Sequence, residues 1–304
     1  MRASLGKLRS LANAVLFATV LASGGCSGGS KSEPPPATPT AGATADDEFA
    51  TALREHHRFH HHGGVTLFIA MSLETLAVPT EKRAAVDQIH GELIASMEPA
   101  RVAEQTLLTA LADGVTSGNI DGAAIDADIQ RVTSAARTVH DTCAGALNRL
   151  HALLSPSERA ALVDKVEANW AVFRRVNTTG TADESVEEQH ELGNLTAELN
   201  LTPEQMQRVD AALCSATAAV PPLDSREIDA ELSAFGDAFR SDTFDAKGLG
   251  AADDANAHMA GWAAAHLAHV VEAVSPVLTA DQRTAFAERL RLHAKHGPIA
   301  EASP

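Results

Sequence analysis

A run of histidines near the N-terminus is the densest group of metal-binding side chains in the sequence. If the run forms a short helix, His56 and His60 share one face and His57 and His61 share another, because residues four apart are neighbours on a helix. Two imidazoles so placed can share a Zn²⁺, Cu²⁺ or Ni²⁺ ion, although a carboxylate or another chain must complete the shell. The candidate metal ligands are His56, His57, His60, His61 and His62.

Two other interpretations of this histidine run stay open. It could be a flexible tail that binds metal only incidentally, and its five imidazoles could act as a pH switch between about pH 5 and 8. We therefore expect no required cofactor, with zinc, copper or nickel as the metals to consider.

The remaining candidates for chemistry are two cysteines and a second group of histidines. Cys143 and Cys214 could form a disulfide in an exported chain, or Cys143 could be a small buried apolar residue. His258, His266 and His269 share a helix face with Trp262, where lining a packed surface is the simpler interpretation and a His266–His269 metal pair the alternative. The sequence has no HExxH or CxxC motif and no other catalytic constellation, so we do not expect an enzyme.

The first residues form an export signal. Arg2, Lys7 and Arg9 precede an apolar stretch at 11–22, which is too short to span a bilayer. Small residues then lead to Cys26, in a pattern that resembles a bacterial lipoprotein cleavage site. We expect a signal peptide at 1–25, a lipidated Cys26 and a Pro/Gly/Ser-rich tether at 26–48, with an ordinary signal peptide cleaved nearby as the alternative. The protein would then be periplasmic and anchored to a bacterial membrane, the outer one rather than the inner, through the lipid alone.

Composition and charge restrict the class of the folded part. The formal net charge of −16 falls to −19 without residues 1–25, which contain three basic residues and no acidic ones. Such acidity argues against binding to nucleic acid or to an anionic membrane surface. With 4% aromatic residues and no Tyr, the core must be built from Ala, Leu and Val, which suits close-packed helices.

Short boxes that resemble helix starts recur along the chain. In each, a Ser or Thr follows an apolar residue and precedes a proline or alanine, with Glu or Gln three residues after the Ser or Thr. The boxes run from Leu201 to Gln205, from Leu278 to Gln282 and from Leu154 to Glu158, with a degraded copy from Val78 to Lys82. The residues that define them are Leu154, Ser155, Glu158, Leu201, Thr202, Gln205, Leu278, Thr279 and Gln282.

The spacing of the boxes predicts a tandem duplication. The first residues of the boxes are 76 residues apart in one pair (78 and 154) and 77 in the other (201 and 278). Ile120-Asp121 and Phe244-Asp245 are 124 residues apart, which matches the offset between the boxes at 154 and 278. We expect a His-rich entry and first helical unit at 49–176, an acidic linker at 177–193, a second unit at 194–297 and a tail at 298–304.

Each unit is expected to contain a long central helix. In the first unit, apolar residues recur every three or four positions from Ile125 to Leu153, as in a coiled-coil seam. The second unit repeats the pattern from Leu249 to Val277, but Asp253 and Asn256 fall on the seam and should fray or re-register its first turns. No segment alternates with the period of a strand, so the predicted fold class is all-α, with two tandem helical hairpin units.

The boxes resemble the LTxxQ motifs of the Spy/CpxP family of periplasmic stress proteins and their zinc-associated relatives. Leu201–Gln205 and Leu278–Gln282 match the motif fully, and Phe244-Asp245 matches the element that opens the family's central helix. The resemblance implies a four-helix hooked hairpin that pairs into a curved cradle, here within one chain. It also implies ATP-independent holding of unfolded envelope proteins, or stress sensing with a sensor kinase as a further partner.

The acidity of this chain departs from the family pattern, because the best-known chaperone members have basic cradles. Electrostatic capture would therefore select different clients or fail. The alternative function is a metal-responsive periplasmic sensor or buffer that uses the histidine run.

Overall fold

The computed structural model describes residues 63–178, 199–219, 223–250 and 252–295. The signal peptide, Cys26, the tether, the histidine run at 56–62 and most of the linker lie outside these residues. Their predicted roles therefore remain predictions.

Within the described residues every regular element is helical and there is no strand, so the predicted all-α class is confirmed. None of these helices combines the length and the apolar character needed to cross a membrane. The elements are α2 (Val65–Glu74), α3 (Thr80–Ser117), α4 (Gly122–Arg137), α5 (Val139–Leu153), α6 (Pro156–Thr178), α8 (Pro203–Ala219), α9 (Arg226–Arg240), the 3₁₀ turn η1 (Ala246–Gly248), α10 (Ala252–Val274), the 3₁₀ turn η2 (Ser275–Val277) and α11 (Ala280–Lys295).

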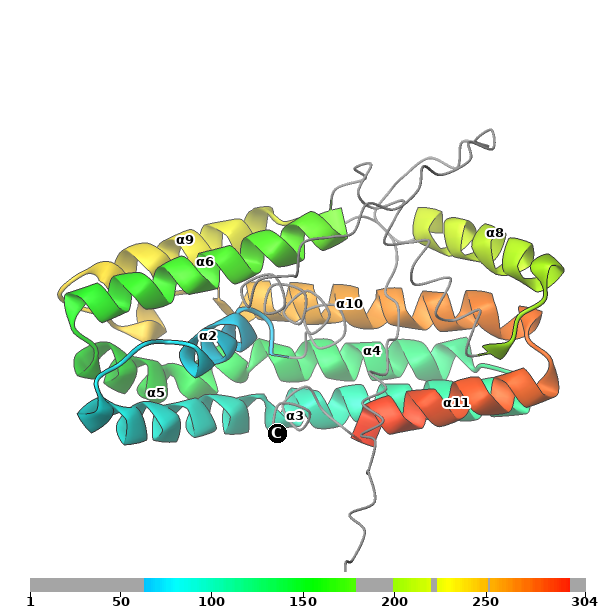
Figure 1. Ribbon diagram of the computed structural model, residues 1–304, viewed down its shortest axis with the longest axis horizontal. Helices are drawn as coiled ribbons and strands as arrows, with labels where there is room; N and C mark the ends of the chain where they lie inside the picture. Colours follow the sequence, from blue (N-terminus) through cyan, green and yellow to red (C-terminus); the bar gives the residue numbers. More distant parts are fainter. Residues whose placement is uncertain (1–62, 179–198, 220–222, 251, 296–304) are drawn as a thin grey trace, which may run out of the picture.

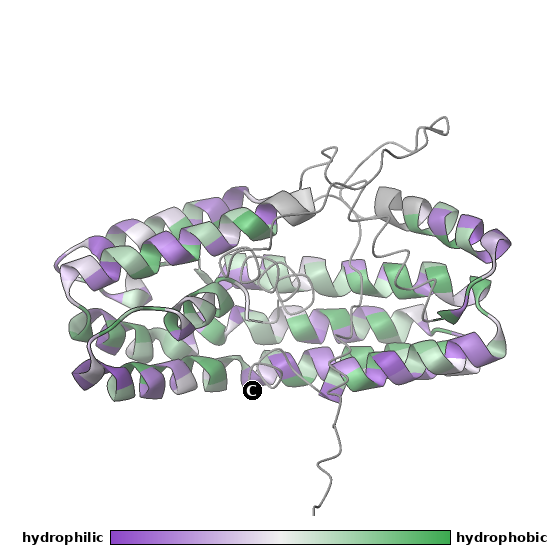
Figure 2. Ribbon diagram, in the orientation of Figure 1, coloured by the Kyte–Doolittle hydropathy of each residue, from purple (hydrophilic) through white to green (hydrophobic). Residues whose placement is uncertain are grey.

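The helices form an elongated bundle in which the two halves of the sequence are interleaved. Figure 1 shows α10 and α4 along the middle, with α5 continuing the line of α4. On one side of this layer lie α3 and α11, and on the other lie α6, α8 and α9. Helices from the first half pack on helices from the second: α3 on α11, α4 on α10 and α6 on α9. The buried residues of both halves belong to one hydrophobic core. Hydrophobic residues predominate in the central α10, whereas hydrophilic residues are plentiful on α6, α9 and α11 (Figure 2).

Helix boundaries recur between the two halves. In the first half α3 runs from Thr80 to Ser117, and in the second half α8 begins at Pro203 and α9 ends at Arg240, each 123 residues later. The second half thus has two helices where the first has one. In return, the second half has the continuous α10 where the first has α4 and α5.

The prediction of a single helix from Ile125 to Leu153 is wrong in one respect, because the structure has two helices, α4 and α5, which are separated at Thr138. The Thr138 N–H and its hydroxyl both donate to the carbonyl of Ala135, and the Thr142 hydroxyl donates to the Thr138 carbonyl. Such side-chain bonds compete with the backbone ladder and bend helices. The apolar pattern itself is confirmed, since its positions are buried on both sides of the break up to Leu150, and Leu153 is partly buried.

The second long helix begins at Ala252 instead of Leu249 and is preceded by the 3₁₀ turn η1, so its first turn is altered as predicted. Asp253 and Asn256 themselves lie inside α10, and Asn256 is only 1% exposed. Its side-chain oxygen accepts the N–H of Val65 at 2.7 Å, which satisfies a free backbone donor at the start of α2. Gly64 precedes α2 with φ 55°, and a Cβ there would lie 2.3 Å from the Asn256 oxygen, so only glycine fits.

Candidate functional site

The two LTxxQ boxes of the second half each start a helix with a reciprocal cap. The N–H of Gln205 donates to the Thr202 hydroxyl at 3.2 Å, and the Gln205 side-chain oxygen accepts the Thr202 N–H at 3.1 Å. Thr279 and Gln282 repeat this arrangement at 3.3 and 2.9 Å. Each box is therefore a capping box, which satisfies two free donors at once.

The same two glutamines also bind each other across the bundle. The Gln205 amide nitrogen donates to the Gln282 oxygen at 2.7 Å, and the Gln282 nitrogen donates back to the Gln205 oxygen at 3.1 Å. Gln205 further donates to the carbonyl of Val277, and Gln282 to that of Leu199. We call Gln205 and Gln282 the second box pair; it ties the start of α8 to the start of α11.

In the first half of the chain, the equivalent contact is an ion pair. Lys82 and Glu158, at the positions that match the two glutamines, form an ion pair of 2.6 Å, which we call the first box pair. The Glu158 carboxylate also accepts the N–H and hydroxyl of Ser155. These bonds from Lys82 and Ser155 lower the pKa of Glu158 from 4.5 to about 2.

An arginine after two of the boxes was not identified from the sequence. Arg159 donates to the carbonyl of Leu154 at 3.3 Å, and Arg283 donates to the carbonyl of Leu278 at 2.9 Å. The leucines themselves are buried in the core. The recurrence of an arginine directly after Glu158 and after Gln282 is a sequence signal that could have shown this contact.

The Phe-Asp elements lie where the sequence predicts helix starts. Asp121 accepts the Ala124 N–H and caps α4, and Asp245 accepts the Lys247 N–H and caps η1. Phe244 packs against His151 of α5, with ring centroids 5.2 Å apart.

Helix α5 also holds the backbone of the segment before α10, a contact that the sequence analysis missed. His140 bonds to the carbonyl of Ala246 at 2.7 Å, and Asn148 accepts the Ala246 N–H at 2.8 Å. His151 bonds to the carbonyl of Ser241 at 2.9 Å. Three polar side chains of the first half thus fix a turn of the second half.

Cys143 is a free, buried thiol in the described part of the chain. The side chain of Cys214 lies outside the described residues, so the disulfide between the two cysteines stays a prediction. The Cys143 sulfur donates to the carbonyl of His140 and lies 4.0 Å from the Thr66 hydroxyl. Burial raises the pKa of Cys143 to about 11, so the thiol stays protonated and unreactive at neutral pH.

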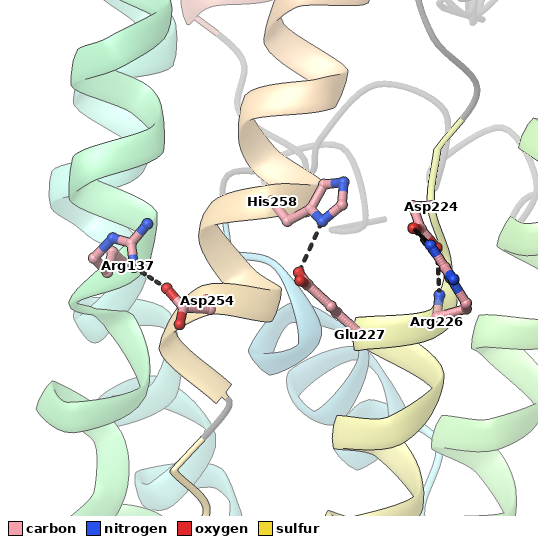
Figure 3. Close-up of polar contacts among 6 residues, drawn as sticks. All are labelled: Arg137, Asp224, Arg226, Glu227, Asp254 and His258. Carbon is pink, nitrogen blue, oxygen red and sulfur yellow. Dashed lines mark hydrogen bonds and ion pairs between the residues drawn. The ribbon is translucent and has the colours of Figure 1, made fainter.

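The histidines of α10 point to different neighbours. His258 lies 3.0 Å from the Glu227 carboxylate (Figure 3), and His266 is buried and stacked on Trp262. His269 bonds to the carbonyl of Ala265 in its own helix. Among the described residues, no three His, Cys, Asp or Glu side chains are grouped in a way that could hold a metal ion.

Two acidic side chains between α9 and α10 lie in an unusual environment. Glu231 of α9 is 2% exposed, and burial together with the charge of Asp253 raises its pKa from 4.5 to about 7. Burial also raises the pKa of Asp253, on α10. Glu231 was missed from the sequence because it looks like an ordinary surface acid of an amphipathic helix.

Neither models of protein families, nor curated proteins, nor solved structures show a match to this chain. No similar protein therefore suggests a function, and the function proposed below is inferred from the chain itself. The described residues that were singled out by sequence fix helix ends and join helices.

Proposed function

We propose that the protein is an ATP-independent, chaperone-like envelope-stress protein that holds unfolded clients on a helical surface. The observation that supports this proposal is that the helix starts marked by the boxes contact each other in pairs. Gln205 forms a hydrogen bond with Gln282, and Lys82 forms an ion pair with Glu158. These boxes are the elements that resemble the Spy/CpxP family. Their pairing supports a rigid scaffold made for binding, and we do not propose a catalytic activity.

The described surface favours electrostatic over apolar capture. Large apolar side chains that are well exposed on it are Val102, at 48%, and Leu292, at 40%. With a net charge near −19 after loss of residues 1–25, the protein would attract unfolded chains that carry basic segments. Salt should weaken such capture, because screening shortens the range of the attraction.

An aggregation assay tests this proposal with two clients of opposite charge. We expect the protein at stoichiometric amounts to delay the aggregation of reduced lysozyme, which is basic, more than that of reduced α-lactalbumin, which is acidic. The preference should shrink at about 0.5 M salt. No protection of either client at a stoichiometric ratio would contradict the proposal.

A metal-responsive sensor or buffer is the second candidate, favoured by the position of the histidine run in the chain. His62 is followed directly by Gly63 and Gly64, which are buried, and by α2, most of whose residues are buried in the core. Metal binding at His56 to His62 would therefore take place in the segment that directly precedes buried residues in the sequence, and could affect the start of α2.

Calorimetric titration with Zn²⁺, Cu²⁺ and Ni²⁺ separates this candidate from the first. We expect binding tighter than about 10 µM that is lost when the five histidines are changed to alanine. A chain with His293→Ala, outside the run, is the control. Weaker binding, or binding that survives the five changes, would exclude the metal function.

We further propose that Cys26 is lipidated and holds the protein at the periplasmic side of the outer membrane. Mass spectrometry of the exported protein should then show acyl chains on Cys26, and Cys26→Ser should release the protein from the membrane fraction. Unmodified Cys26 in the exported protein would rule out the anchor.

A further inference from the structure

Two acidic residues one turn apart on α9 face α10. Glu227 and Glu231 are four residues apart, so they lie on the same face of the helix. Glu227 contacts His258 through oxygen and Nδ1 atoms 3.0 Å apart, as Figure 3 shows. Glu231 feels the charge of Asp253, which lies five residues before His258 in α10. We call these four residues the α9–α10 seam.

The inner part of the seam contains a buried acid that faces a like charge. Glu231 is 2% exposed, and the charge that acts on its carboxyl group is the negative one of Asp253. The Oδ1 atom of Asp253 is also buried without a hydrogen-bond partner. A buried carboxylate without a counter-charge is strongly disfavoured, so such a group takes up a proton instead.

The charges around the inner part of the seam are mostly negative. Asp253 faces Asp141 and His140 of α5 and lies beside Asp254, whose carboxylate forms an ion pair with Arg137 of α4 (Figure 3). Cys143 also lies within electrostatic range of Asp253. His140 is the one neighbour that can carry a positive charge among the residues that act on Asp253.

At the outer part of the seam and on the opposite side of α9, the charges are already paired. Asp224 interacts with His258 and forms an ion pair with Arg226 (Figure 3). On the α6 side, Asp229 accepts from Trp170 and from Arg174.

Further along α9, Arg240 bonds to Asp164 and Glu167 of α6. None of these α6 contacts supplies a cation to Glu231.

We propose that the α9–α10 seam is a proton-operated latch, in which Glu231 binds a proton as the pH falls and thereby holds α9 more firmly against α10. Protonation of the buried Glu231 carboxylate removes its repulsion from Asp253 on the facing helix. The contact of Glu227 with His258 joins the same two helices at the outer part of the seam.

The direction of the pH effect follows from the shift of Glu231. Its pKa is about 7 in the folded protein, against an ordinary value of 4.5. Between these values the folded state holds a proton that the unfolded state has lost. The stabilisation is therefore complete below about pH 4.5 and is lost as the pH rises through about 7.

Opening the latch would expose an apolar face. Ile228, Leu232, Phe235 and Phe239 of α9 are each at most 3% exposed in the closed structure. The latch does not depend on the proposed function, since it is a property of the seam alone.

Hydrogen exchange of the α9 amides tests the latch in the full chain. After correction for intrinsic rates, we expect protection in α9 to fall by roughly 10- to 100-fold between pH 5 and pH 8. Glu231→Gln, which imitates the protonated acid, should abolish most of this fall. Asp237→Asn removes the same charge from an exposed position of α9 and should keep the fall.

A direct titration keeps the inference testable if Glu231→Gln fails to fold. The ¹³C resonance of the Glu231 carboxyl group in the unmodified protein should titrate near pH 7. A midpoint below about pH 5, or an α9 protection that is the same at pH 5 and pH 8, would overturn the latch.

Discussion

The two box pairs occupy matching places in the two halves but use different chemistry. In the second half Gln205 and Gln282 exchange two amide hydrogen bonds, whereas in the first half Lys82 and Glu158 form an ion pair. Each contact joins the first residues of two helices that begin far apart in the sequence. The same joint can therefore be closed by neutral or by charged side chains.

The difference follows from what each side chain can donate and accept. A glutamine amide does both, so each glutamine caps its own helix and also binds its partner. Lysine only donates, and α3 accordingly begins after Pro79 with no side-chain cap. Glu158 therefore serves both as cap and as partner, and the first box pair acquires a dependence on pH and salt that the second lacks.

The largest effect is expected when the second box pair is removed. Gln205 is 6% exposed, and Gln205→Ala deletes the cap of Thr202, the bond to Val277 and both bonds to Gln282. We expect the free energy of unfolding to fall by about 2–3 kcal/mol, measured by chemical denaturation, because a buried side chain loses all these bonds at once and its partners in α11 and η2 are only partly open to water.

Two further variants make this result specific. Gln207→Ala changes the same residue type at an exposed position of α8 and should cost less than about 0.5 kcal/mol. Lys82→Ala, in a pair whose side chains are 25% and 12% exposed, should cost about 1 kcal/mol or less. An equal cost for Lys82→Ala and Gln205→Ala would show that the two pairs do not differ as described.

Local patterns in the sequence predicted the helices well because each depends on neighbouring residues only. Thr202 indicated a helix start with a side-chain cap, and the apolar seam from Ile125 onward indicated a buried stripe; both are confirmed. The reciprocal bond from Gln205 was not predicted. The break at Thr138 was missed because hydroxyl bonds to the backbone leave the apolar spacing unchanged.

Contacts between distant segments could not be predicted in this way. Asn256 looked like a defect in α10 until the start of α2 was placed beside it. Glu231 looked like a surface acid because only the packing of other helices against α9 buries it. The cross-bundle pairing of Gln205 with Gln282 likewise depends on the packing of α8 and α11, which neither box contains.

Acid should weaken the first box pair while leaving the second intact. The pKa of Glu158 is lowered to about 2 in the folded protein, so the stabilisation it provides is present above about pH 4.5 and is lost as the pH falls toward 2. Water screens this pair near the surface, so we expect a loss of about 1 kcal/mol.

The measurement compares the protein with Glu158→Gln by chemical denaturation at pH 5 and pH 2. The variant cannot ionise at this position, so the difference between the two proteins should shrink in acid. A difference that is unchanged between pH 5 and pH 2 would mean that the charge of Glu158 contributes nothing to stability.

The smallest effect is expected when the first box pair is converted into the chemistry of the second. The double change Lys82→Gln and Glu158→Gln places two amides where the ion pair lies, with the cap of Ser155 kept by the new side-chain oxygen. Because two amide bonds replace one screened ion pair, we expect the stability to change by less than about 0.5 kcal/mol at low salt. The dependence of stability on salt between about 0.05 and 1 M should decrease, since a neutral pair is not screened. A large loss of stability would mean that the surroundings of Lys82 are shaped for a charge, and the two halves would then have diverged in packing as well as in the residues of the joint.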